Sequence, residues 1–246
     1  MFKVATTLLF FLFTITANAQ KQEKLTIRHL TGNFYVYVTY NEYQGNRIGA
    51  NAMYLVTNKG VVLFDTPWDT TQFQPLLDSI KARHHKEVIL CFATHFHEDR
   101  TGGLDYYNQK GIATYTTAFT DSLSRKRGMK RAAHLMTKDT TFTVGGYSFS
   151  TYYPGRGHAP DNIVIWFAKE KILYGGCLVK STTDNTLGNL GDASIADYAN
   201  TIKNVQRKCP DSKYIITGHN DYSSTRSLQH TYRMAKALQK RKPVQH

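Results

Sequence analysis

The sequence has few cysteines, few acidic residues and only one long hydrophobic run. Its 246 residues include three cysteines. Three cysteines cannot form a dense disulfide framework, and an odd number leaves at least one without a partner in the chain. Linkers, low-complexity tracts and internal repeats are also missing. These absences favour one globular domain of ordinary size.

The single long hydrophobic run lies at the N-terminus, within residues 1–20 (MFKVATTLLFFLFTITANAQ). A lysine, an apolar stretch and then Ala17-Asn18-Ala19 form the pattern of a secretory signal peptide cleaved after Ala19. The apolar stretch is short for a membrane span, although an uncut anchor is the alternative. We therefore predict a signal peptide at 1–19, a single domain at 20–246, a periplasmic protein, and no membrane partner after cleavage.

Acidic residues are outnumbered by basic ones. The chain has 31 lysines and arginines against 18 aspartates and glutamates, which gives a net charge of +13. Such a charge can attract nucleic acid, an anionic membrane or acidic substrates. The basic residues are scattered, however, with short clusters only at Arg125–Arg131 and Lys236–Lys242 and no recognisable nucleic-acid motif. We interpret the charge as a solvated surface and expect no nucleic-acid partner.

Hydrophobic periodicity predicts a mixture of strands and helices. A polar segment with two glycines, residues 41–51, is predicted to be a hairpin loop, and Thr70 or Thr71 is predicted to cap a helix that runs to about residue 84. Further helices are predicted near 117–126, 195–207 and 227–240. Strands are predicted at 33–40, 52–57, 61–64, 88–93, 147–153, 163–167, 172–174 and 214–216. This order favours stacked sheets with helices outside.

Two histidines and an aspartate follow the apolar strand at 88–93. His95, His97 and Asp99 stand at alternate positions, which point the same way in an extended segment. Imidazole nitrogens bind zinc well, and a carboxylate adds an oxygen ligand. The alternative is a polar loop with solvent-facing histidines. A buried strand that opens directly into such a cluster favours the metal site.

Three further segments repeat one pattern, in which a glycine and then a metal-binding side chain follow a predicted strand. They carry His158, Cys177 and His219. A lone histidine or cysteine at a strand end is more often structural. Strand ends on one rim of a layered fold are where sites assemble, so the three segments together predict that these side chains meet the first cluster.

In order and spacing, these motifs resemble the signature of the class B metallo-β-lactamases, subclass B1. The resemblance runs from about Gly32 to the C-terminal helix and rests on His95-Phe96-His97-Glu98-Asp99 with Gly102-Gly103, Gly157-His158 with Asp161-Asn162, Gly176-Cys177-Leu178-Val179-Lys180-Ser181, and Gly218-His219. Other hydrolases of that fold, including glyoxalase II and the transfer-RNA-processing nucleases, usually have a histidine where Arg100 stands and an aspartate in place of Cys177. His95 instead of asparagine disfavours the mono-zinc B2 subclass.

The resemblance implies an α/β fold, a four-layer αββα sandwich in which two mixed sheets lie face to face with helices outside. It also implies two zinc ions, one bound by His95, His97 and His158 and the other by Asp99, Cys177 and His219. Cys177 would then be a thiolate ligand. Cys91 and Cys209 would remain, the former as a core residue, with a disulfide between them as the less favoured alternative.

The implied function is hydrolysis of the β-lactam amide of penicillins, cephalosporins and carbapenems by zinc-activated hydroxide, which confers antibiotic resistance. Asp99 would also orient the nucleophile, Lys180 would bind the substrate carboxylate, and Asn189 would help to stabilise the oxyanion. Asp65 would support the ligand loop, and the 41–51 hairpin, with Tyr43, would cover the substrate. We expect a monomer.

Two other functions are compatible with the sequence. One is a zinc hydrolase of the same fold that acts on another ester, thioester or lactone, which Arg100 and Cys177 disfavour. The other is an exported metal-binding protein without activity, which the presence of all six ligands disfavours.

Overall fold

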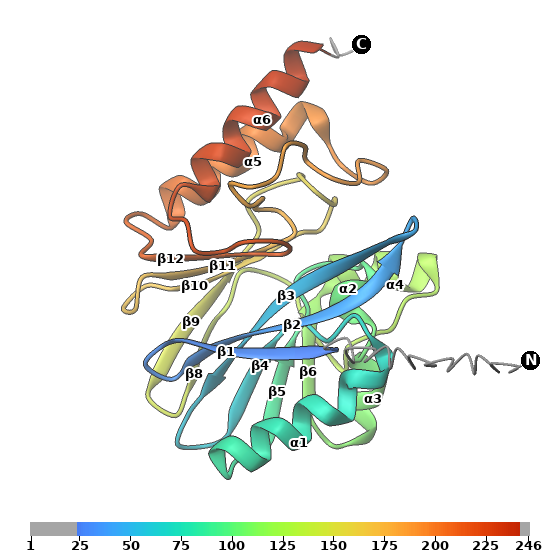
Figure 1. Cartoon of the computed structure of the whole chain (residues 1–246), viewed down its shortest axis with the longest axis vertical. Helices are drawn as coiled ribbons and strands as arrows, with labels where there is room; N and C mark the ends of the chain where they lie inside the picture. The colour runs from blue at the N-terminus through green and yellow to red at the C-terminus, as the bar shows by residue number, and fades with distance from the viewer. Residues whose placement is uncertain (1–23, 242–246) are drawn as a thin grey trace, which may run out of the picture.

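Two β-sheets packed face to face form the centre of the protein, and helices cover both outer sides (Figure 1). The computed structural model describes residues 24–241. The arrangement confirms the four-layer αββα sandwich. The predicted signal peptide and the end of the basic tail, Lys242, lie outside the described residues. Among the described helices, none combines the length and the apolar character needed to cross a membrane.

The first sheet has seven strands that lie side by side in sequence order. It consists of β1 (Leu25–Thr31), β2 (Phe34–Tyr43), β3 (Asn46–Val56), β4 (Val61–Phe64), β5 (Val88–Phe92), β6 (Ala113–Thr117) and β7 (His134–Met136). Strands β1 to β4 pair antiparallel, and β4 to β7 pair parallel. The parallel part places the C-terminal ends of β4 and β5 at the same edge of the sheet.

The second sheet has five strands in the order β12, β11, β10, β9, β8. Their bounds are β8 (Thr141–Val144), β9 (Tyr147–Tyr152), β10 (Val164–Phe167), β11 (Ile172–Gly176) and β12 (Tyr214–Thr217). Only β11 and β12 pair parallel, so the chain leaves both at one end. Large aromatic side chains from both sheets, including Phe64, Phe92, Phe149 and Phe167, fill the space between them.

The helices bury one face each against a sheet. Helices α1 (Phe73–His84) and α3 (Leu104–Gln109) pack on the first sheet, and α5 (Ile195–Lys208) and α6 (Ser227–Arg241) pack on the second. The short helices η1 (Thr70–Gln72) and α2 (Glu98–Thr101) and helix α4 (Ala118–Arg127) complete the chain. In α1 the apolar residues Phe73, Leu76 and Ile80 recur at helical spacing and are buried.

Two of the predicted boundaries are wrong. Residues 41–51 are not a loop, because β2 and β3 continue through them and pair down to Tyr43 and Asn46. Gln44 and Gly45 make the tight turn, with φ values of 51° and 75°. At Gly45 the positive φ carries no steric penalty, because glycine has no Cβ. Neither Thr70 nor Thr71 caps a helix. Asp69 caps η1, where its side chain accepts from the Thr71 backbone N–H at 2.8 Å, and α1 begins after Gln72 without a side-chain cap.

Cys91 and Cys209 are buried free thiols. Cys91 lies in the apolar layer between the first sheet and its helices, whereas Cys209 lies in the layer beneath α5 and α6. These layers are on opposite sides of the sandwich. The alternative of a disulfide between them is therefore wrong.

The predicted ligands emerge from one rim of the sandwich. His95 follows β5, Cys177 follows β11, and His219 follows β12. Backbone hydrogen bonds join the two sheets at this rim, from Asn51 N–H to the Gly218 carbonyl at 2.8 Å and from Ile163 N–H to the Thr94 carbonyl at 2.9 Å. The segments that follow β5 and β12 are thereby fixed to the facing sheet.

Candidate metal centre

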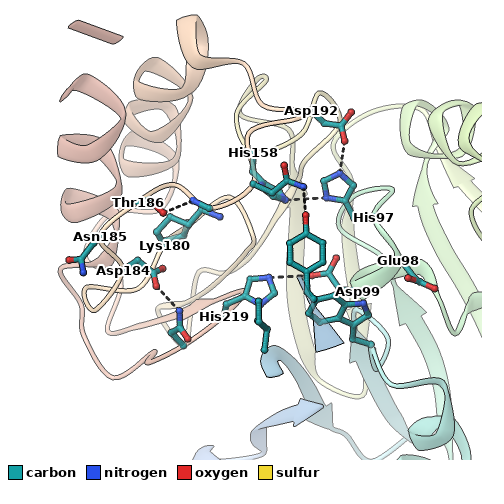
Figure 2. A pocket seen from close by; sticks show the side chains of 17 residues that line it. His97, Glu98, Asp99, His158, Lys180, Asp184, Asn185, Thr186, Asp192 and His219 are labelled. Carbon is teal, nitrogen blue, oxygen red and sulfur yellow. Dashed lines mark hydrogen bonds and ion pairs between the residues drawn. The ribbon is translucent and has the colours of Figure 1, made fainter. Parts of the chain in front are cut away.

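Three imidazole rings meet at the rim. The Nε2 atom of His95 lies 3.0 Å from Nδ1 of His97, and that Nδ1 lies 3.2 Å from Nε2 of His158. Figure 2 shows His97 and His158 turned toward each other across the upper side of the pocket. In each contacting pair of ring nitrogens at most one can carry a proton, so lone pairs of the three rings are directed at a shared centre. A metal ion requires this arrangement.

Burial keeps two of these rings neutral. Desolvation lowers the pKa of His95 and of His158 well below the ordinary value of 6.5, and the neighbouring cationic groups, Lys180 among them, lower it further. Both rings therefore carry an unprotonated nitrogen at pH 7. Neutral imidazole is the form that binds zinc.

Asp99, Cys177 and His219 form a second group beside the first. The Sγ atom of Cys177 lies 3.3 Å from Oδ2 of Asp99 and 3.3 Å from Nε2 of His219. Oδ2 of Asp99 is also 3.3 Å from Nε2 of His219. The two groups adjoin, because the ligand atoms of His95, His97 and Asp99 also lie within 4.8 Å of one another.

The charges in this second group favour a cation. Burial would raise the pKa of Asp99, but Arg100 and His219 hold it well below 3.8, so the carboxylate is ionised. Burial would lower the pKa of His219, but Cys177 and Asp99 raise it to about 9. Cys177, Asp99 and His219 offer a sulfur, an oxygen and a nitrogen, which is the mixed donor set of a zinc ion. A bound cation would replace the proton that His219 holds at neutral pH. The six residues thus fit a metal centre.

Hydrogen bonds to the ring nitrogen that points away from the centre fix the direction of two of the predicted histidine ligands. The Nε2 atom of His97 lies 3.1 Å from the carboxylate of Asp192, which leaves Nδ1 directed at the other rings. The Nδ1 atom of His219 lies 2.8 Å from the carbonyl oxygen of Gly49, which directs Nε2 at Cys177. Such partners set the tautomer and the orientation of metal-binding histidines. Asp192, which Arg127 also contacts at 2.8 Å, has no local sequence signal that would have revealed this contact.

Asp65 supports the segment that carries His95. Its carboxylate accepts from the Thr94 N–H at 2.7 Å, from the Thr94 hydroxyl at 2.8 Å and from the Tyr174 hydroxyl at 2.6 Å. Its backbone has a φ of 67°, a conformation that non-glycine residues rarely adopt. Burial raises the pKa of Asp65 to about 6, against the opposing effect of Arg100 and these hydrogen bonds.

Arg100 is a buried arginine at the centre of the rim, a role that sequence reasoning missed. Its guanidinium donates to Oδ2 of Asp99 at 2.9 Å and to Sγ of Cys177 at 3.0 Å. It also donates to the carbonyl oxygens of Gly218 at 2.9 Å and of Asn51 at 2.7 Å. One side chain thereby connects two of the predicted ligands to strands of both sheets.

A pocket of about 450 Å³ opens over the metal centre. Lys180 and Asn189, predicted to contact substrate, both line it, and Lys180 is only 7 % exposed. Burial lowers the pKa of Lys180. The side-chain amide of Asn189 donates to the hydroxyl of Tyr43 at 3.1 Å, so the tip of the β2–β3 hairpin contacts the opposite wall. The Trp68 ring lies between the rings of Tyr43 and His219. Its centroid is 6.3 Å from the Tyr43 centroid and 6.1 Å from the His219 centroid.

Comparison with known proteins identifies the family that has this fold and donor set. The sequence profile of the metallo-β-lactamase superfamily matches residues 45–219. A metallo-β-lactamase type 2 from Elizabethkingia meningoseptica is 43 % identical over 217 residues, which cover 88 % of this chain and 87 % of that protein. Metallo-β-lactamase IND-1 from Chryseobacterium indologenes is 39 % identical over 87 % of this chain and 90 % of that protein.

Solved structures agree with the sequence relatives. The crystal structure of metallo-β-lactamase IND-7 superposes with a TM-score of 0.84 at 38 % identity, over 88 % of this chain and 100 % of that chain. A fold with two facing sheets and a rim of histidine, aspartate and cysteine defines a metal-dependent hydrolase. The chain belongs to the metallo-β-lactamase superfamily.

Proposed function

We propose that the chain is an exported zinc-dependent β-lactamase that hydrolyses the cyclic amide of penicillins, cephalosporins and carbapenems and so confers resistance to them. The observation that carries the proposal is the juxtaposition of a six-residue donor set with a buried lysine in one pocket. The curated relatives, which are named metallo-β-lactamases, support the same reaction.

The donor set supports two zinc ions. The family resemblance implies that His95, His97 and His158 would hold one and that Asp99, Cys177 and His219 would hold the other. The six donor atoms lie close enough for this, in overlapping groups in which His95 also lies near Cys177 and Asp99. Zinc held there would supply Lewis acidity and lower the pKa of a water molecule toward about 7.

The residues of the pocket wall account for substrate recognition. Lys180 would bind the carboxylate of the β-lactam, since a buried ammonium group exchanges its few water contacts for an anionic partner. Asn189 would donate one N–H of its side-chain amide to the developing oxyanion of the lactam carbonyl, while the other N–H donates to the Tyr43 hydroxyl. The ionised Asp99 carboxylate would accept a hydrogen bond from the attacking water and so orient it.

The substrate class is tested by comparing acyl compounds with the purified, zinc-loaded protein. The expected result is turnover of a penicillin, a cephalosporin and a carbapenem, which is monitored as the loss of absorbance of the β-lactam ring. Turnover of a thioester or a simple lactone without any β-lactam would instead support a different hydrolase of this fold. Full zinc binding without turnover of any of them would indicate a metal-binding protein without activity.

Export, a single domain and a monomeric state complete the proposal. A mass spectrum of the protein isolated from the periplasm is expected to show an N-terminus at Gln20. Light scattering is expected to give the mass of one chain.

A further inference from the structure

Helices α5 and α6 gather on their outer face basic residues that are scattered in the sequence. We call these five residues the basic helix face; they are Lys203, Arg207, Arg233, Lys236 and Lys240, and all are exposed. Figure 1 shows the two helices over the outer side of the second sheet. The five side chains are exposed there to solvent.

Helical spacing and the packing of the two helices place these side chains together. On α6, Arg233, Lys236 and Lys240 follow one another by three and four residues, so they lie along one side of the helix. On α5, Lys203 and Arg207 are four residues apart. The ammonium group of Lys203 lies 5.4 Å from the centroid of the Tyr232 ring on α6, which joins the two rows.

The side of each helix that faces the sheet is apolar. Val205 on α5 and Leu228 and Ala235 on α6 are buried in the layer beneath. The orientation of the two helices is fixed by this burial, and it leaves the basic rows on the opposite side. The basic helix face is therefore a permanent feature of the fold.

The charge of this face is not neutralised within the protein. Among residues 24–241, none of the five cations takes part in an ion pair within 4.0 Å. The one acidic residue of the two helices, Asp197, accepts a hydrogen bond from the Ser194 hydroxyl at 2.7 Å. Elsewhere the protein does pair such groups, as Arg131 does with Asp121 at 2.7 Å.

We propose that the basic helix face binds the surface of an anionic phospholipid bilayer. Clusters of four to eight lysines and arginines on a helical surface attract anionic lipid headgroups over about one Debye length. The binding would be peripheral, with no insertion, since the large exposed apolar side chains Phe119, Leu135 and Tyr153 all lie outside these helices. The prediction of no membrane partner is revised to this extent, because the sequence did not show that the fold collects these charges.

The composition of the face favours lipid over the other anionic partners. Single-stranded nucleic acid is bound by basic grooves with exposed aromatic rings, whereas the aromatic ring here, Tyr232, is partly buried beside Lys203. Protein interfaces are depleted in lysine and have an apolar centre, which this face lacks. A bilayer needs only a broad surface of uniform positive charge.

Membrane binding through this face leaves the pocket free. No residue of α5 or α6 lines the pocket over the metal centre. Substrate could therefore enter while the protein is bound to lipid. Charge changes on the face should not affect turnover, which separates a failure of this proposal from a failure of the proposed enzymatic function.

The test measures co-sedimentation of the zinc-loaded protein with lipid vesicles. The protein is produced from the full chain and isolated after export, with its N-terminus determined. One vesicle preparation contains equal parts of phosphatidylglycerol and phosphatidylcholine, and the other contains phosphatidylcholine alone. The test variant carries Lys203→Glu, Lys236→Glu and Lys240→Glu. A control with the same change in charge, away from both helices, carries Lys59→Glu, Lys110→Glu and Lys138→Glu.

The wild-type protein and the control are expected to bind the anionic vesicles and not the neutral ones. Each cation near the surface contributes about fivefold to the affinity for anionic lipid, and the test variant lacks three of them. It is therefore expected to bind the anionic vesicles at least about 100-fold more weakly. Binding should weaken steeply as salt rises to about 0.15 M.

Equal binding by the two triple variants would overturn the proposal, because net charge alone would then explain the attraction. Absence of binding between the wild-type protein and the anionic vesicles at low salt would also overturn it. So would tighter binding to single-stranded DNA than to the vesicles through the same three lysines. Unchanged folding of both variants is verified by their thermal unfolding.

Discussion

Replacing Arg100 with methionine would test how the metal centre is built into the fold. The guanidinium is fully buried and donates to Asp99 at 2.9 Å, to Cys177 at 3.0 Å and to the carbonyl oxygen of Gly218 at 2.9 Å. Methionine has a similar length and an apolar side chain, so it fills the space but makes none of these hydrogen bonds. The buried Asp99 carboxylate would lose the nearer of its two cationic partners and keep only His219, at 3.3 Å.

The expected loss is about 3–5 kcal/mol of unfolding free energy, which is the usual effect of breaking a buried ion pair by removing one partner. A domain of this size has a total stability of about 5–15 kcal/mol, so the Arg100→Met variant should still fold at low temperature. The same change removes a donor from the Asp99 and Cys177 ligand atoms. We therefore also expect weaker retention of metal at the second group.

The assay is urea-induced unfolding of the metal-free protein, followed by tryptophan fluorescence, which separates folding from metal binding. Arg125→Met is the matched control. The Arg125 side chain is 70 % exposed and lies 3.5 Å from Asp121. An exposed pair of this kind contributes at most about 1 kcal/mol. If Arg100→Met loses no more unfolding free energy than the control, the buried ion pair of Arg100 does not stabilise the fold as proposed.

Four other changes have defined outcomes. Lys180→Met should raise the KM for a β-lactam by about 10-fold to 100-fold with little change in kcat, because a hydrogen bond to a charged group contributes about 1.5–3 kcal/mol; steady-state kinetics measure it. Tyr43→Phe should lower kcat by about twofold to tenfold, since Asn189 loses a neutral hydrogen bond. Cys177→Ala should release metal from the second group and reduce turnover while the circular dichroism stays unchanged; wild-type turnover would contradict the two-zinc assignment. Burial raises the pKa of Asp161 to about 6. Its protonated form is therefore favoured in the fold, so this group lowers the stability of the metal-free protein by at most about 3 kcal/mol as pH rises from about 4 to about 6. Asp161→Asn should lose this part of the fall and keep the part that comes from Asp65, whose pKa burial also raises to about 6.

The parts of the site that sequence reasoning found are those with a local pattern. His95, His97 and Asp99 share one extended segment, and His158, Cys177 and His219 each follow a glycine near a strand end. Alternation along a strand and the position of strand ends are properties of a few neighbouring residues. The four-layer fold followed from the order of the apolar segments together with the family resemblance.

The parts that it missed depend on contacts between distant segments. Arg100 contacts residues 77 and 118 positions away, and Asp192 lies 95 positions from His97. No window of sequence contains both partners. The basic helix face is partly of the same kind, since its row on α5 and its row on α6 become neighbours only when the two helices pack against each other.

The extent of the β2–β3 hairpin was misread for a different reason. Residues 41–51 are polar, which is typical of a loop, but these strands extend past the sheet, where they cover the pocket and gain little from apolar side chains. Backbone pairing continues through them to Tyr43 and Asn46 and keeps them extended, and polarity patterns do not report backbone pairing.

A zinc titration of the metal-free protein, with carbapenem hydrolysis and bound zinc determined on the same samples, tests the proposed two-zinc β-lactamase. We expect no turnover after chelation, recovery on addition of zinc, and a plateau at two zinc ions per chain. Carbapenem turnover that persists in the chelated protein, or zinc that binds at the six residues without restoring any turnover, would contradict it.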